Sequence, residues 1–117
     1  MSLRAIRGAI QIDANTAGAI ESGVKELLPA ILEANHLTPE GVISVILTCT
    51  PDLTAAFPAA FAREIGFGAV PLICAVEMDV PGALGLVIRV MLHAELDAPA
   101  NHIYLRGATS LRRDLAQ

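Results

Sequence analysis

The sequence has few aromatic residues and little positive charge. It has no tryptophan, one tyrosine and three phenylalanines, and its basic residues are seven arginines and the single lysine Lys25. The formal net charge is -4. Proteins that follow a nucleic acid backbone need clustered positive charge, and those that bind single strands also need aromatic rings on which bases stack. The composition therefore argues against a nucleic acid partner.

Cysteine is also scarce, and both cysteines lie in apolar stretches. Cys49 stands within GVISVILTCT and Cys74 within AVPLICAVEMDV, so we expect buried thiols in a reducing compartment and no disulfide framework. The amino-terminal MSLRAIRGAIQID has no signal-peptide core, and no apolar run reaches membrane-spanning length without a charge. These features predict a soluble cytoplasmic protein with no membrane partner.

Motifs for several common kinds of catalysis are missing as well. The three histidines, His36, His93 and His102, have no metal-ligand spacing with the cysteines, so we expect no metal site. There is no G-x-G-x-x-G or Walker motif for phosphates, and no G-x-S-x-G nucleophile motif. Cys74 as a nucleophile is an alternative, although its setting favours a buried core thiol. An enzyme of this sequence would be one that needs no nucleophile, metal or cofactor.

Apolar residues, by contrast, are abundant. They make up 54% of the chain, whereas charged residues make up 17%, which predicts a folded protein rather than a disordered one. The length fits one domain over 1–117, with a polar tail from about residue 110 that we expect to be flexible. The apolar fraction exceeds what a small monomer needs, so we expect a homo-oligomer in which partner chains cover part of the surface.

Hydrophobic periodicity predicts the element order β-α-β-α-β-β-β. Period-two alternation or continuous β-branched runs predict strands, and spacings of three and four predict helices. Pro29 is expected to kink or interrupt the first helix. The pattern favours an α+β (mixed α/β) fold, with one mixed sheet of about five strands and two main helices on one face. The predicted strands are 3–12, 41–50, 69–80, 87–96 and 103–109, and the predicted helices are 17–35 and 59–66.

Arg89 is the most informative residue of the fourth predicted strand, VIRVMLHAEL. Apolar residues flank it on both sides, and an unpaired buried guanidinium is costly because arginine keeps its charge. The alternation puts Arg89 on one face of this strand. The same face would hold Met91, His93 and Glu95, and the other face Val87, Val90, Leu92 and Ala94.

Other polar residues accompany Arg89 on predicted strands. Arg7 lies in the first strand, Glu77 ends the third and Tyr104 lies in the fifth. For any one of them, a charge that reaches solvent from a strand end is the simpler interpretation. Together, in a chain with so few charges, they indicate a polar pocket for a small molecule. Arginines in such a pocket favour an anionic ligand, a carboxylate or a phosphate.

Several blocks of the sequence, taken in order, resemble the AroH-class chorismate mutases. The likeness covers almost the whole chain, and although each block is modest alone, their order and spacing are specific. The blocks are RAIRGAIQID, EANH, TPDLTAAFPAAFAREI, VPLICAVEMDVPGAL, IRVMLHAELDAP and HIYLRGATSLRRDL. The resemblance implies conversion of chorismate to prephenate, on the route to phenylalanine and tyrosine, by a pericyclic rearrangement without a cofactor. It also implies a homotrimer with a barrel-like core and three active sites between subunits.

The resemblance further implies roles for individual residues. Arg89 would stabilise the charge that develops on the ether oxygen, Arg7 would bind a substrate carboxylate, and Glu77 would accept from the ring hydroxyl and orient Arg89. Cys74 would line the same end of the site, Tyr104 would contact the enolpyruvyl side, and Arg112 in the tail would help capture the substrate. A neighbouring subunit would supply Phe57, Ala59, Arg63, Ile73 and Leu111. Ala60 stands where some members of the family have a lysine near the substrate.

Two alternatives remain at this point. One is a trimeric deaminase of the Rid type, which also uses an arginine for a substrate carboxylate, although the motifs of that family are not found here. The other is a non-catalytic trimer that binds a metabolite of the aromatic pathway. The combination of Arg7, Glu77 and Arg89 argues against pure binding, since a binding protein has no need of a cation directed at the ether oxygen.

Overall fold

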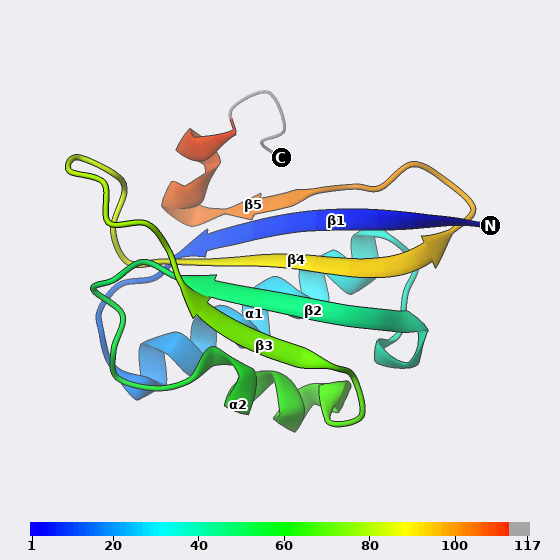
Figure 1. Ribbon diagram of the computed structural model, residues 1–117, viewed down its shortest axis with the longest axis horizontal. Helices are drawn as coiled ribbons and strands as arrows, with labels where there is room; N and C mark the ends of the chain where they lie inside the picture. Colours follow the sequence, from blue (N-terminus) through cyan, green and yellow to red (C-terminus); the bar gives the residue numbers. More distant parts are fainter. Residues whose placement is uncertain (113–117) are drawn as a thin grey trace.

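The structure is a computed structural model that describes residues 1–112 (Figure 1). The residues 113–117 of the predicted flexible tail lie outside the described residues. The order of elements is the predicted one. Its strands are β1 (Ser2–Gln11), β2 (Val42–Cys49), β3 (Leu72–Val76), β4 (Val87–Leu96) and β5 (Ile103–Leu105). Its helices are α1 (Ala17–Ala34) and α2 (Pro58–Ala62), with the helical turns η1 (Pro39–Gly41), η2 (Arg63–Phe67) and η3 (Arg106–Leu111).

The strands form one mixed sheet in the order β3-β2-β4-β1-β5. At its centre β1 and β4 pair antiparallel along their whole lengths, from Ser2 opposite Leu96 to Gln11 opposite Val87. β2 is antiparallel to β4, whereas β3 runs parallel to β2 and β5 runs parallel to β1. The fourth strand has the predicted bounds, and the predicted mixed sheet of about five strands is confirmed.

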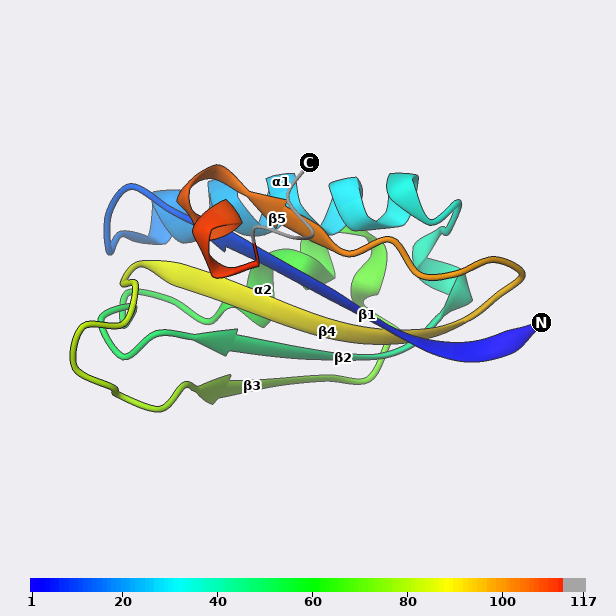
Figure 2. The ribbon, with the colours of Figure 1, turned by 90° about the horizontal axis from the view of Figure 1, so that it is seen from above.

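Both helices lie on the same face of the sheet (Figure 2). On β1 the alternate residues Ile6, Gly8 and Ile10 are buried on this side, and apolar residues of α1 pack against them. The residues of α1 in this core are Ile20, Val24, Leu27, Leu28 and Ile31. The other face of the sheet is not covered by a helix in Figure 2, and the strand side chains Ile46, Ile73 and Met91 are exposed there.

Helix α1 begins as predicted but passes through its proline. The Thr16 hydroxyl accepts the Ala19 N–H at 3.1 Å and caps the first turn. The predicted interruption at Pro29 is wrong, since the helix runs on to Ala34. Pro29 is exposed, so water can reach the Lys25 carbonyl that loses its helical partner. Of the helices within residues 1–112, none combines the length and hydrophobicity needed to cross a membrane.

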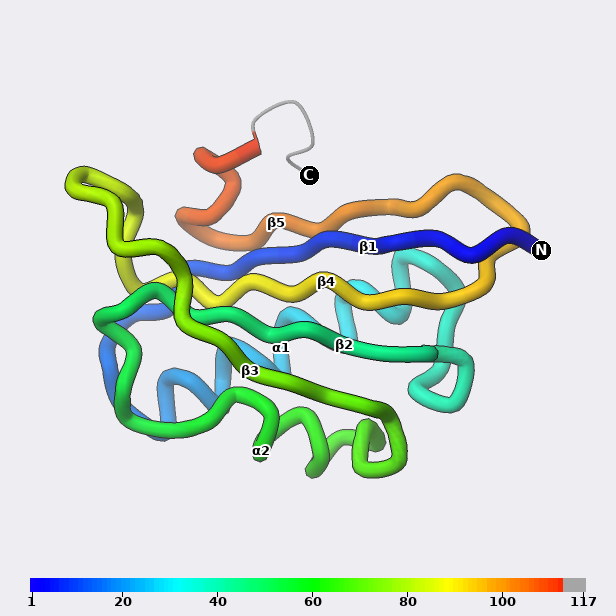
Figure 3. The backbone as a smooth tube through the Cα atoms, in the orientation of Figure 1, coloured from blue at the N-terminus to red at the C-terminus, as the bar shows by residue number. Residues whose placement is uncertain are grey.

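The third and fifth predicted strands are several residues longer than the observed ones. The third strand ends at Val76, after which residues 77–86 leave the sheet, cross the ends of β2 and β4, and return into β4 (Figure 3). The fifth strand ends at Leu105, where Arg106 takes a φ of 53° and turns the chain into η3. A side chain at Gly107 would collide with Gln11, so this residue allows η3 to lie close to the end of β1.

A second, small core lies on the face opposite the helices. Val87, which we predicted to share a face with Val90, instead has the same orientation as Arg89 by strand alternation. It is nevertheless fully buried, because Ala9, Tyr104 and Ala108 pack with it. β5 and η3 therefore cover one end of the face that the helices leave open.

Gly8 offers a test of how tightly α1 packs on the sheet. A Cβ at this position would lie 2.5 Å from Ile31 Cδ1 and 3.1 Å from both the Ile103 carbonyl oxygen and Val90 Cγ1. Gly8→Ala should therefore lower the free energy of unfolding by about 1–3 kcal/mol, as overpacking does in other cores. Urea unfolding followed by circular dichroism measures this change.

Gly18 is the matched control for this substitution. A Cβ there would meet nothing within 4 Å, and alanine is the better helix former by about 1 kcal/mol. Gly18→Ala should therefore hold or raise stability. Equal stability of Gly8→Ala and the parent would contradict the tight helix–sheet contact.

Candidate active site

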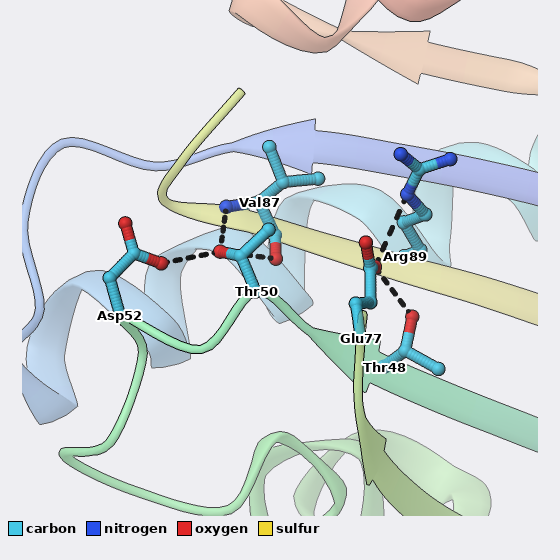
Figure 4. A network of polar contacts seen from close by, with 6 residues as sticks. All are labelled: Thr48, Thr50, Asp52, Glu77, Val87 and Arg89. Carbon is cyan, nitrogen blue, oxygen red and sulfur yellow. Dashed lines mark hydrogen bonds and ion pairs between the residues drawn. The ribbon is translucent and has the colours of Figure 1, made fainter. Parts of the chain in front are cut away.

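Three side chains, two from strands and one from the residue after a third strand, meet on the open face of the sheet (Figure 4). Arg89 lies on β4, and Thr48 lies directly opposite it on β2. Glu77 follows the last residue of β3, and its backbone N–H donates to the Cys49 carbonyl at 2.9 Å. Arg89 Nε lies 3.2 Å from Glu77 Oε2, and the Thr48 hydroxyl donates to the same oxygen at 2.7 Å.

The pair of charges is partly open to solvent. The Arg89 side chain is 44% exposed and the Glu77 side chain is 18% exposed. Arg89 thus faces away from the core, and its charge is met by a carboxylate from the edge of the sheet. The flanking apolar residues of VIRVMLHAEL belong to the opposite, buried face, where Ile88, Val90 and Leu92 pack. Alternation, rather than burial of a cation, explains the sequence of this strand.

Arg7 lies beside Arg89 on the same face. Ala9 pairs with Arg89, and Arg7 stands two residues earlier on β1, opposite Met91. This diagonal arrangement brings long side chains on adjacent strands within reach of each other. Within residues 1–112 Glu77 pairs with Arg89, whereas Arg7 forms no ion pair. This part of the face therefore carries more positive than negative charge, which suits an anion.

The backbone of Arg7 is hydrogen-bonded to the ring of His102. The Arg7 backbone N–H donates to His102 Nδ1 at 3.0 Å, so this nitrogen acts as an acceptor. Burial lowers the pKa of His102 from its usual value, and the positive charges of Arg7 and Arg112 lower it further. Arg112 follows η3 at the end of the described chain, and its charge is close enough to His102 to lower the pKa of that histidine.

Tyr104 and Leu111 lie at this end of the face as well. Tyr104 pairs with Ala9 on β1 and is almost fully buried in the small second core. Leu111 is partly buried against the same core. Six of the predicted site residues thus share one region of the single chain: Arg7, Glu77, Arg89, Tyr104, Leu111 and Arg112.

The start of β4 is anchored by a polar clasp (Figure 4). The carboxylate of Asp52 accepts the Thr50 hydroxyl at 2.5 Å and the Leu86 backbone N–H at 2.9 Å. The Thr50 hydroxyl oxygen in turn accepts the Val87 N–H at 3.0 Å. Leu86 has a φ of 58°, so the chain turns sharply here. The clasp fixes the point at which the 77–86 segment re-enters the sheet, three residues before Arg89.

The remaining predicted site residues lie elsewhere in the chain. Phe57, at the amino terminus of α2, is 75% exposed, and Arg63 is exposed on η2. Ala59 is buried within α2. Ile73 is exposed on β3, and its partner Ile46 belongs to the open face.

Cys74 lies on the edge strand β3. It is exposed, so the prediction of a buried thiol is wrong here, although it is correct for Cys49. Because Cys74 pairs with the fully buried Leu47, it points to the helix side of β3 and not towards Arg89. An apolar run does not distinguish an edge strand from a central one, which explains the error. Burial, with the nearby Cys74, Glu77 and Asp52, raises the pKa of the Cys49 thiol to about 12.

Cys74 and Phe57 together line an open groove of about 550 Å³ between β3 and the loop before α2. A second hollow, of about 650 Å³, lies at the far end of the sheet around residues 34–38 and 95–101, and holds none of the predicted site residues. Among residues 1–112 there is no group of three or more His, Cys, Asp and Glu side chains arranged to hold a metal ion.

Sequence reasoning missed Thr48, Asp52 and the contact of His102 with Arg7. Asp52 stands inside the TPDL block, but nothing in that block indicates that it reaches Leu86. Thr48 belongs to no motif, and its partner Glu77 is 29 residues away along the chain. The one sequence signal for Thr48 is a hydroxyl in a largely apolar predicted strand.

The lowered pKa of His102 predicts a loss of stability in acid. An unfolded chain takes up a proton on this histidine near pH 6.5, whereas the folded chain resists it, so stability falls as the pH drops through that value. His102→Asn keeps an acceptor for the Arg7 N–H but does not titrate. Melting temperatures measured between pH 7.5 and pH 5.5 should fall less steeply for His102→Asn than for the parent, and identical slopes would contradict this role of His102.

Comparison with known proteins points to one family. The family described as chorismate mutase type I matches residues 3–115. A protein named Chorismate mutase AroH from Bacillus subtilis is 43% identical over 120 residues, covering 99% of this chain and 94% of that protein. One of the same name from Thermus thermophilus is 48% identical over 117 residues, covering 97% and 96%.

A solved structure is similar over the same range. A chorismate mutase from Clostridium thermocellum superposes with a TM-score of 0.89 and 44% sequence identity, covering 92% of this chain and 98% of that one. The match of the family to nearly the whole chain, together with these relatives, leads to one conclusion: this chain belongs to the chorismate mutase type I family.

Proposed function

We propose that this chain is an isomerase that rearranges chorismate to prephenate, the step on the route to phenylalanine and tyrosine for which its family is named. The observation that carries the proposal is the position of Arg89, held by Glu77 and next to Arg7 on one face of the sheet. Chorismate is a dianion, and this face offers a surplus of positive charge. The chain is thus an enzyme, and neither the deaminase nor the pure binding protein is favoured.

The reaction needs no acid, base or nucleophile. One C–O bond of the substrate breaks while a C–C bond forms within the same molecule, so catalysis consists of holding the reactive shape and stabilising charge. Negative charge grows on the ether oxygen as the C–O bond breaks. A guanidinium directed at that oxygen interacts more strongly with the transition state than with the substrate, and only such interactions raise the rate. This role belongs to Arg89.

The neighbouring residues would bind and orient the substrate. Arg7 would clamp a carboxylate with its planar fork. Glu77 would accept from the ring hydroxyl and hold Arg89, while Tyr104 would contact the enolpyruvyl side. Leu111, which the resemblance assigns to a neighbouring subunit, packs against the core that includes Tyr104 in the same chain and would extend this apolar wall. Arg112 would help capture the dianion from the edge of the face.

The rest of the site would come from a second copy of the chain, in a homotrimer. Phe57, Ala59, Arg63 and Ile73, which the resemblance assigns to a neighbouring subunit, lie outside the cluster around Arg89. Cys74, which the resemblance places at the Arg89 end of the site, lies with Phe57 along a separate groove and would join this second set. Exposed apolar side chains on the open face, among them Ile46 and Met91, supply surface for such an interface. A cyclic arrangement would pair the Arg89 face of one subunit with the Phe57 groove of the next.

Two further statements concern the whole chain. Residues 1–117 would form one domain, since one sheet and one main core include elements from both ends of the described chain. The enzyme would act in the cytoplasm, where its two free thiols, Cys49 and Cys74, stay reduced.

The first test is turnover, together with substitution of Arg89. The purified protein should consume chorismate without added metal or cofactor. The loss of the ultraviolet absorbance of chorismate measures the reaction, and acid conversion of the product to phenylpyruvate confirms prephenate. Arg89→Lys should lower kcat by about a hundredfold or more, as loss of a transition-state donor does. The KM should change much less.

Arg4→Lys is the matched control, because Arg4 is an exposed arginine at the far end of β1. It should keep the parent kcat. Since no group exchanges a proton in the chemical step, kcat should also stay nearly flat around neutral pH. Absence of turnover, a parent-like kcat for Arg89→Lys or a steep pH profile centred at neutrality would contradict the mechanism.

Mixed oligomers test the shared site. Arg89→Ala and Arg63→Ala should each lose most of their activity when pure. If each site takes Arg89 from one subunit and Arg63 from the next, refolding the two variants together in equal amounts should restore about a quarter of the parent activity. Native mass spectrometry should show three chains. No recovery on mixing, or a monomeric mass, would refute an intersubunit site.

A further inference from the structure

We propose that Thr48 is a positioning residue that sets the orientation of Glu77 and, through it, of Arg89. This inference rests on the proposed function, because it concerns the same site. Thr48 has no role in the reasoning from sequence, and its hydroxyl does not need to touch the substrate to act. The contacts of one oxygen atom, Oε2 of Glu77, support this role (Figure 4).

Both contacts of the Glu77 carboxylate converge on Oε2. The Thr48 hydroxyl donates to it at 2.7 Å and Arg89 Nε lies 3.2 Å from it. Neither contact uses the other carboxylate oxygen, Oε1. The hydroxyl and the guanidinium therefore share one carboxylate oxygen, which leaves Oε1 for the ring hydroxyl of the substrate.

Thr48 is a stiff donor, whereas Glu77 is a flexible acceptor. A β-branched side chain on a strand has a restricted χ1, so the Thr48 hydroxyl is fixed relative to the sheet. Its backbone is also fixed, because Thr48 pairs with Arg89 on one side and Ala75 on the other. Glutamate has three side-chain torsions that lose entropy when they are ordered. The backbone N–H of Glu77 binds Cys49, so the Thr48 hydroxyl adds a second fixed point, at the carboxylate end.

The orientation of Arg89 follows from that of Glu77. With Nε directed at Oε2, the two terminal nitrogens of the guanidinium point away from the carboxylate (Figure 4). They are the donors available to a bound anion. If the Glu77 carboxylate rotates, Arg89 loses its anchor, and at 44% exposure its long side chain has room to move.

Thr48→Val removes the hydroxyl but keeps the branched shape and the strand preference. We expect kcat to fall about tenfold, the size of one lost hydrogen bond to a charged group. The KM should stay within about threefold of the parent value, because Arg7 still binds the carboxylate. Thr48→Ser restores a hydroxyl on the same carbon and should recover most of kcat. Thr48→Ala serves as a second hydroxyl-free variant and should match Thr48→Val.

Ser44→Ala is the matched control. Ser44 lies on the same strand and face as Thr48, and its hydroxyl contacts His93 Nδ1 at 3.2 Å, away from Glu77. This variant should keep the parent kcat. A loss equal to that of Thr48→Val would show a general effect of strand hydroxyls and would overturn the proposal.

A double-mutant cycle separates positioning from general structure. In a Glu77→Ala background Thr48→Val should cause no further loss of kcat, because the carboxylate on which it acts is gone. An equal tenfold loss in both backgrounds would mean that Thr48 acts on something else. A parent-like kcat for both Thr48→Val and Thr48→Ala would also overturn the proposal.

Nuclear magnetic resonance gives a readout that does not depend on turnover. In the parent, the Arg89 Nε–H should exchange slowly with water because it is bound to Glu77. It should exchange several-fold faster in Thr48→Val and at the parent rate in Ser44→Ala and Thr48→Ser. If the protein does not turn over chorismate, the proposed function fails, but this measurement still decides the role of Thr48. Unchanged exchange of the Arg89 Nε–H in Thr48→Val would refute that role.

Discussion

The antiparallel pairing of β1 with β4 is the constraint on which the rest of the molecule depends. The two strands pair residue by residue over their whole lengths. Ile6 and Ile10 are then opposite Leu92 and Ile88, and all four lie under α1. Because side chains alternate, Arg7 and Arg89 must emerge together on the other face. A slip of one residue in either strand would send its arginine into the core, so the hydrophobic pattern that fixes the register also assembles the site.

The ion pair of Arg89 with Glu77 positions the guanidinium and adds little to the stability of the fold. A pair between partly exposed side chains contributes about 0–1 kcal/mol to folding, because water screens the charges and two long side chains must be ordered. Its cost and benefit for the fold nearly cancel. What the pair does provide is a defined direction for a cation. The Thr50–Asp52 clasp has the same character, since it fixes where the 77–86 segment rejoins β4 and hence where Arg89 stands.

Local patterns predicted the parts of the fold that depend on local sequence. The bounds of β4 and the start of α1 at residue 17 both follow from hydrophobic periodicity. The errors come from tertiary contacts. β5 ends early because Arg106 turns and Gly107 fits against Gln11, and Cys74 is exposed because β3 is an edge strand. The residues proposed for the site came from a resemblance over almost the whole chain, whereas Thr48 could not be found because its partner is distant in sequence.

The apolar side chains beside the arginines affect how strongly the charge of Arg89 can act. In a single chain, Arg89 is open enough to be screened by water, and a charge in water stabilises a developing anion only weakly. The same guanidinium acts far more strongly when water is excluded, because the dielectric falls while its orientation stays fixed. Ile46 and Met91 lie next to the arginines on the open face and offer a surface that a second copy can cover. A cation that would be costly to bury alone would be matched there by a dianionic substrate, so covering the proposed site with a second copy would increase catalysis without leaving an uncompensated charge.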